Sequence, residues 1–147
     1  MDNTKKALSD SSVYRLDTQV GYLLRLANQR HALIFQDQME ESLTPTQFTT
    51  LLRIAEEGEV SQNHLGRLAA MDVATIKGVV DRLRAKNLLR SHPDPDDKRR
   101  SLISLTEEGA AMIADLTRMG EAITELTLAP LKASEQKTLI ALLQKIS

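Results

Sequence analysis

Charged side chains of both signs are concentrated in one short stretch, HPDPDDKRRSLISLT, which spans residues 92–106. Three aspartates and two prolines are followed at once by three consecutive basic residues, Lys98, Arg99 and Arg100. A solvated turn would explain this composition without any function. The alternative is a loop at the tip of a hairpin that reaches for a charged partner. The pattern of the other residues distinguishes a solvated turn from a loop that contacts a charged partner.

Few other residues could carry chemistry. The three histidines, His31, His64 and His92, are far apart in the sequence, and the chain has no cysteine. There is no HExxH motif, no glycine-rich phosphate loop and no nucleophile–base pattern. Residues 94–97 contain three aspartates and imitate a Ca²⁺ loop, but the following glycine and the distant glutamate are missing. We therefore expect no catalytic residue, no metal site and no cofactor.

Basic side chains gather in the middle of the chain. Residues 60–101 hold nine lysines and arginines against five aspartates, a local charge of +4 in a chain whose net charge is −1. A basic middle between acidic ends favours a local anionic partner such as nucleic acid over a generally cationic surface.

Length and composition are those of one globular domain. The chain has 147 residues, 41% of them hydrophobic and 27% charged. No run of 18 apolar residues occurs, and the first residues, MDNTKKALSDSS, lack the apolar stretch of a signal peptide. The expected location is cytoplasmic, without membrane contact.

The spacing of apolar residues predicts helices over most of the first half. Helical periodicity runs from 13 to 41 and predicts one long helix. Residues 44–47, TPTQ, have the signature of a capping box with proline at the first helical position, so a second helix begins there and stops at Gly58. Ser61 and Asp72 cap two short helices that only a few residues separate, as in a helix-turn-helix.

The second half begins with a predicted hairpin. Residues 101–106, SLISLT, alternate as in a half-buried strand. Thr106 caps a fifth helix that runs to Pro130, and a last helix begins near Ser134. The expected fold class is mainly α: a winged helix-turn-helix with a two-stranded β wing and long terminal helices. The hairpin is too small to be stable alone and must pack against the helices. Because a hairpin that follows a helix-turn-helix is a wing, the charged stretch lies at the tip of the wing.

The fourth predicted helix has an apolar stripe that packs inward and a polar face on the opposite side. The polar face is formed by Ala74, Thr75, Lys77, Gly78, Asp81 and Arg82. Small residues let the backbone approach base edges, Thr75 can contact a thymine methyl or a phosphate, and Lys77 can reach guanine or the backbone. Gly78 costs about 1 kcal/mol of helix stability relative to alanine, which close approach to DNA would explain; a solvated face is the alternative. Ser61 and Gln62 either cap the preceding helix or offer amides to a phosphate.

LGRLAAMDVATIKGVVDRLRAKNLL followed by PDPDDKRRSLISLTEEG resembles the MarR family of bacterial winged-helix transcription regulators. The most specific part is VVDRL, then an acidic proline turn with Asp-x-Arg at 97–99, then LT-x-x-G at 105–109. The resemblance covers essentially the whole chain. It implies one domain over 1–147, with a DNA-binding lobe over 45–105 and dimerisation helices over 11–42 and 106–147.

The resemblance implies a sequence-specific DNA-binding regulator, in the simplest case a repressor. The arginine of the Asp-x-Arg motif, here Arg99, would enter the minor groove beside the recognition helix in the major groove. Asp97 would orient the loop or pair with a nearby base, and Lys98 and Arg100 would contact phosphates. A narrow A·T-rich minor groove concentrates negative potential and attracts a guanidinium.

The resemblance also implies a homodimer that reads a pseudo-palindrome and is released by a small aromatic carboxylate or phenolic effector. The candidate ligand contacts are Arg25, His31, Phe48 and Met112. His31 interrupts an apolar stripe, so it is either a hydrogen-bonded core histidine or, near Arg25, a group that binds the anion. The segments RLANQRH and SQNHLGRLAAMDVATIKG resemble those of family members that regulate the breakdown of aromatic or nicotinate-type acids.

A protein-interaction module without specific DNA binding is the alternative function for the same fold. DNA binding should depend steeply on salt, roughly in proportion to the phosphates neutralised, whereas a protein interface with an apolar centre should not.

Overall fold

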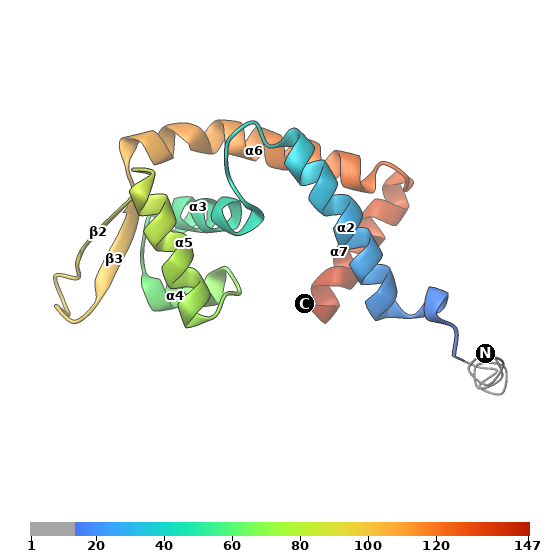
Figure 1. Cartoon of the computed structure of the whole chain (residues 1–147), viewed down its shortest axis with the longest axis horizontal. Helices are drawn as coiled ribbons and strands as arrows, with labels where there is room; N and C mark the ends of the chain where they lie inside the picture. Colours follow the sequence, from blue (N-terminus) through green and yellow to red (C-terminus); the bar gives the residue numbers. More distant parts are fainter. Residues whose placement is uncertain (1–13) are drawn as a thin grey trace, which may run out of the picture.

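The computed structural model describes residues 14–147, which form a lobe and an arm joined by one long helix (Figure 1). Helices α3 to α5 and the sheet form the lobe, α2 and α7 form the arm, and α6 runs along the top of the view between them. In chain order the elements are η1 (Leu16–Thr18), α2 (Val20–Gln38), α3 (Pro45–Glu57), β1 (Glu59–Ser61), α4 (Gln62–Leu68), α5 (Val73–Ala85), β2 (Leu89–Pro93), β3 (Ser101–Leu105), α6 (Glu107–Leu128) and α7 (Ala133–Ile146).

The first helix is shorter than the sequence predicts. Instead of one helix over 13–41, the structure has the 3-10 turn η1 and then α2, and position 13 lies outside the described residues. The interruption falls at Gln19, whose backbone is extended (φ −86°, ψ 132°). At the other end Met39 is also extended, and the chain turns so that Leu43 is buried in the core of the lobe.

The helix starts that capping residues predict are confirmed. Thr44 accepts a hydrogen bond from the Gln47 backbone, and the Gln47 side chain accepts one from the Thr44 backbone, which closes the capping box. Ser61, Asp72 and Thr106 each accept a hydrogen bond from the backbone N–H three residues further on, at the starts of α4, α5 and α6. The helix-turn-helix is therefore α4 and α5, at the predicted position.

A third strand joins the predicted two-stranded wing. β2 and β3 form the antiparallel hairpin, and β1 pairs with the other edge of β3 to give the order β1–β3–β2. Val60 of β1 lies opposite Ile103, and both side chains are buried. β1 has three residues and directly follows Gly58, which ends α3 with φ 79°, so no alternating run marks it in the sequence.

The core of the lobe is built from aliphatic side chains of all its elements. The predicted inward stripe of α5 is confirmed, since Ile76, Val79, Val80 and Leu83 are buried. Phe48 of α3 is half-buried and packs against this core. The largest fully buried side chains come from α3, α4, α5, the sheet and α6, and include Leu51, Ile54, Leu65, Ile76, Leu83, Leu89, Ile103 and Leu116.

α6 is fixed to the base of the wing. A Cβ at Gly109 would stand 2.3 Å from the Leu88 carbonyl oxygen, so only glycine lets the helix lie this close. Thr106 donates a hydrogen bond to the Asn87 carbonyl oxygen at 2.7 Å. These contacts hold the start of α6 against the residues that lead into β2.

The arm exposes most of the large apolar side chains that the structure leaves in solvent. Within residues 45–105, Val73 is the one exposed large hydrophobic residue. The segment before α2, the arm and the end of α6 expose Tyr14, Leu16, Val20, Leu23, Leu24, Leu26, Leu33, Leu126, Ile140, Leu142 and Ile146. Among the described residues, no helix is long and apolar enough to cross a membrane.

Candidate nucleic-acid interface

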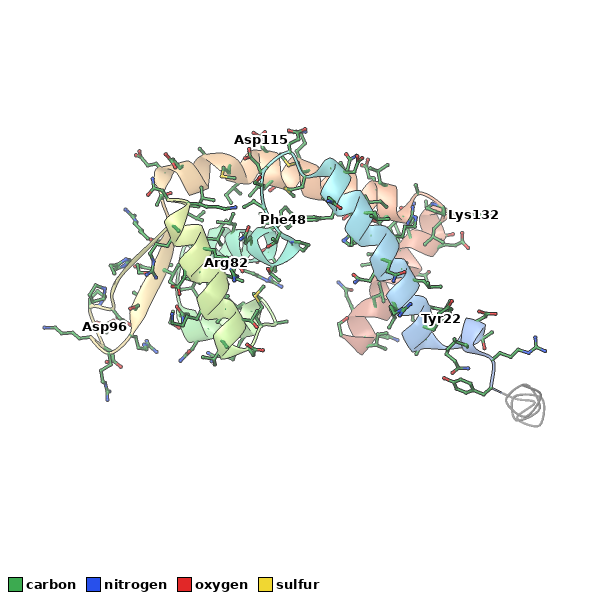
Figure 2. The ribbon with its side chains drawn as sticks, in the orientation of Figure 1. Tyr22, Phe48, Arg82, Asp96, Asp115 and Lys132 are labelled. Atoms are coloured by element: carbon green, nitrogen blue, oxygen red, sulfur yellow. The ribbon has the colours of Figure 1, made fainter. Side chains whose placement is uncertain are left out.

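Helix α5 presents the predicted polar face to solvent. Ala74, Thr75, Lys77 and Arg82 are exposed, and Gly78 is half-buried between them. Figure 2 shows Arg82 on α5, the helix that lies beside the wing. Because the buried stripe holds the opposite side of the helix against the core, this face is fixed in orientation.

Lys77 is paired along its own helix. Its Nζ lies 2.8 Å from Oδ2 of Asp81, and both side chains are largely exposed. The hydrogen bond from Lys77 lowers the pKa of Asp81 below its ordinary value. A lysine that contacts DNA from this position would exchange one anionic partner for another.

Gly78 has no packing role among residues 14–147. A Cβ built there would meet only the Nη1 atom of Arg82, at 3.6 Å, which is the end of a flexible side chain. Gly66 of α4 is different, because its Cβ would lie 3.2 Å from both Ile76 Cγ2 and the Met71 carbonyl oxygen. Gly66 is thus explained by the close packing of α4 on α5, whereas Gly78 is explained by nothing in the described residues.

The turn before α5 fixes its first residues. Met71 donates a backbone hydrogen bond to Gly66 at 2.8 Å, and Ala70 has φ 54°, in the left-handed region. Asp72 Oδ1 accepts from the Thr75 amide at 2.7 Å, and hydrogen bonding from Thr75 lowers the pKa of Asp72. The Thr75 amide is therefore occupied at the start of the helix, and the residue itself is exposed.

Asp94 organises the tip of the wing, a role that the sequence did not reveal. Its side chain is 7% exposed; Oδ1 accepts the Asp96 amide at 2.9 Å, and Oδ2 lies 3.2 Å from Nη2 of Arg100. Backbone bonds from Asp94 to the Arg100 carbonyl and from Arg100 to the Asp97 carbonyl, both 2.9 Å, close the turn. Hydrogen bonding from the Asp96 amide, and then the Arg100 guanidinium, lowers the pKa of Asp94. Figure 2 shows Asp96 at the outer end of the wing.

Arg99 extends from this turn into solvent. Its side chain is 92% exposed, and Asp97 Oδ1 accepts from its backbone amide at 3.0 Å and from its Nε at 3.3 Å. Asp97 thus holds both the backbone and the side chain of Arg99, and its two expected roles, orienting the loop or pairing with a base, stay predictions. Lys98, the neighbouring residue, is exposed as well.

A polar depression of about 370 Å³ brings several of the predicted DNA contacts together between α4 and the wing. Ser61 and Gln62 line it from one side, and Arg99 and Arg100 from the other. Arg67 also lines it and was not singled out from the sequence, where it was one of nine basic residues in the charged middle. The complete lining is Ser61, Gln62, Asn63, Arg67, Arg99, Arg100 and Ser101.

Three other basic side chains of the central segment have structural partners. Arg84 donates to Ser91 Oγ at 2.6 Å, and Arg90 donates to Ser104 Oγ at 3.1 Å, which ties the wing to α5 and its strands to each other. Lys86 donates to the Ser42 carbonyl oxygen. The local charge of +4 is therefore only partly available at the surface that α5 and the wing form.

The predicted ligand contacts are not gathered into one pocket. His31 Nδ1 lies 2.8 Å from Thr127 Oγ1, and Arg25 is exposed on α2. Phe48 packs edge-to-face against Phe35 at a centroid distance of 5.7 Å. Met112 packs against the core of the lobe. A pocket of about 530 Å³ beside Phe48 is lined by α3 and α6 residues, Phe48, Leu52, Thr117, Gly120, Glu121, Thr124 and Glu125.

Comparison with known proteins identifies the class. A sequence model of the MarR family matches residues 43–101. Over 138 residues the chain is 41% identical to the HTH-type transcriptional repressor NicR of Pseudomonas putida. The alignment covers 93% of this chain and 87% of NicR. Fold and similarity together define a DNA-binding transcription regulator, not an enzyme. The chain belongs to the MarR family, as the sequence resemblance predicted.

Two solved structures with the same fold concern a small-molecule effector and operator DNA. Bordetella bronchiseptica BpsR, whose DNA binding is regulated by 6-hydroxynicotinic acid, has a TM-score of 0.86 at 37% identity, over 90% of this chain and 96% of its own. A mutant MarR from Escherichia coli complexed with operator DNA has a TM-score of 0.80 at 27% identity, over 86% and 92% of the two chains.

Proposed function

We propose that the protein is a homodimeric repressor that binds a pseudo-palindromic operator, with α5 in the major groove and Arg99 in the minor groove, and that a small aromatic acid releases it. The observation that carries the DNA-binding geometry is the wing tip. There a buried Asp94 closes the turn, Asp97 holds Arg99, and the guanidinium extends into solvent. A guanidinium presented in this way suits a narrow minor groove.

On the other side of the interface, α5 would read base edges from its first turns. Ala74 and Gly78 leave room for the backbone to approach, and Thr75, Lys77 and Arg82 are exposed beside them. Ser61, Gln62, Lys98 and Arg100 would contact the sugar–phosphate backbone, which positions a protein without reading sequence. The similarity to a MarR protein in complex with operator DNA supports DNA binding by this fold.

Dimerisation accounts for the apolar surface of the arm. An apolar groove of about 400 Å³ separates α2 from α7, lined by Val20, Leu23, Leu24, Ala27, Leu139, Leu142, Leu143, Lys145 and Ile146. Contiguous apolar surface of this kind marks a protein interface. A two-fold dimer reads half-sites about 34–36 Å apart.

The effector is proposed to be an aromatic acid of the nicotinate type. The support is the similarity to BpsR, which responds to 6-hydroxynicotinic acid. Arg25, His31, Phe48 and Met112 remain the proposed contacts. The proposed place of action is the bacterial cytoplasm, where the chromosome lies.

Fluorescence anisotropy with duplexes from the gene's own promoter tests this proposal. We expect tight binding to a pseudo-palindrome, a steep fall with added salt, and release by one member of a panel of aromatic acids that includes 6-hydroxynicotinic acid. Binding that is no tighter than to a random duplex would refute the operator claim, and binding that no acid weakens would refute the effector claim.

A further inference from the structure

The depression between α4 and the wing has an unusual charge balance. Its lining includes three arginines, Arg67, Arg99 and Arg100, and no acidic residue. Arg99 is paired with Asp97, and Arg100 with Asp94. Among the described residues Arg67 has neither an ion pair nor a side-chain hydrogen bond, so three guanidinium groups face two carboxylates. One positive charge is left, and it belongs to Arg67.

The depression also lies between the two parts of the protein that enter the grooves. Helix α4 packs against both α5 and β3, so its outer surface is bounded by the recognition helix on one side and the wing on the other. In a duplex, a major groove and the adjacent minor groove are separated by a single sugar–phosphate strand. If α5 occupies one groove and Arg99 the next, that strand has to pass across α4.

We infer that this depression binds one backbone phosphate per half-site and that Arg67 is the main contact to that phosphate. The inference rests on the proposed DNA binding. A phosphodiester carries one negative charge, which matches the single uncompensated positive charge of the depression. A guanidinium can bind two phosphate oxygens at once, and the side-chain amides of Gln62 and Asn63 supply further donors at the same rim.

The role of Arg67 differs from that of Arg99. A phosphate contact fixes the position of the protein on the duplex and adds affinity on any sequence, whereas a groove contact distinguishes sequences. Arg67 would thus hold the DNA strand at a fixed distance from the protein, between the recognition helix and the wing. This distance sets how deeply the recognition helix and the wing enter their grooves.

The salt dependence of binding measures this contact. Each phosphate neutralised contributes about 0.9 to the slope of log K against log salt. Arg67→Ala should therefore reduce the slope of a dimer on two half-sites by about 1.8, weaken binding by more than about tenfold at 0.1 M salt, and do so equally on operator and random duplexes. Arg67→Lys keeps the charge and should keep most of the slope.

Arg118→Ala is the matched control, because it removes the same charge from α6, where Arg118 pairs with Glu40 and Asp115. Its slope should equal that of the wild type. An unchanged slope for Arg67→Ala would overturn the inference, and so would a loss of slope in Arg67→Lys as large as in Arg67→Ala. Wild-type protein that binds no DNA would refute the proposed function instead.

Duplexes with a single neutral methylphosphonate locate the phosphate. Wild-type binding should weaken at one position per half-site, on the strand between the two grooves, and Arg67→Ala should be insensitive to the substitution at that position. Equal sensitivity of the two proteins at every position would overturn the assignment.

Discussion

One carboxylate oxygen of Asp97 accepts two hydrogen bonds from Arg99, at 3.0 Å from the backbone amide and 3.3 Å from Nε. The same oxygen thus fixes both the turn and the direction in which the arginine leaves it. Nη1 and Nη2 remain available to a partner, and the side chain is 92% exposed.

Arg99→Ala should weaken operator binding at least about tenfold, because loss of a directed base-edge contact costs about 1–3 kcal/mol. Titration in a gel-shift assay measures the effect, and size-exclusion chromatography should show an unaltered dimer. Asp97→Asn should have a smaller effect of the same kind, since the guanidinium is still present but less well held. Wild-type affinity in the alanine variant would contradict the role of the wing.

Gly78→Ala should separate stability from function. Alanine is favoured over glycine within a helix by up to about 1 kcal/mol, and a Cβ at this position meets only Nη1 of Arg82 at 3.6 Å. The variant should therefore be more stable in urea denaturation and yet bind the operator more weakly, because the methyl group keeps the helix from the base edges. If affinity and stability both rise, the glycine has no role in the approach to DNA.

The wing should lose stability in acid through Asp94. Its pKa is lowered in the folded protein by hydrogen bonds from the Asp96 amide and from Arg100. The stabilisation is complete above the ordinary aspartate pKa of 3.8 and is lost as the pH falls through the lower pKa of the folded wing. Asp94→Asn removes this group, so the difference in free energy of unfolding between wild type and variant should shrink from pH 5 towards pH 2. A constant difference would show that ionisation of Asp94 does not stabilise the wing.

His31→Ala should leave DNA binding intact and blunt release by the effector. The structure offers a direct control, because the hydrogen-bond partner of His31 is Thr127 Oγ1 at 2.8 Å. Thr127→Val removes the same hydrogen bond but leaves the imidazole in place. If the two variants lower the melting temperature equally and neither alters release, His31 is a core histidine and no ligand contact.

Local signals in the sequence were sufficient for most of the lobe. Capping residues fix helix starts through hydrogen bonds that span three residues, so Thr44, Ser61, Asp72 and Thr106 could be read directly. The resemblance also placed Asp97 and Arg99 within one motif, but the hydrogen bonds between the two residues come from the structure.

Features that depend on distant parts of the chain could not be read in this way. Whether α2 begins at 13 or 20 depends on local backbone and on the arm, and periodicity alone does not report it. His31 meets Thr127 across 96 positions of sequence. Arg67 differs from Arg84 and Arg90 only in what the fold places beside it: a polar depression in one case, serine hydroxyls in the others.

Dimethyl sulfate probing of the operator complex tests the central claim most directly, because it reports guanine N7 in the major groove and adenine N3 in the minor groove in one experiment. We predict protected guanine N7 positions in two patches about 34–36 Å apart, where α5 enters, and protected adenine N3 positions beside each patch, where Arg99 enters. Adenine N3 protection should disappear in Arg99→Ala while the guanine pattern persists. A uniform reaction along the duplex, or protection in one groove only, would contradict the proposed two-groove binding.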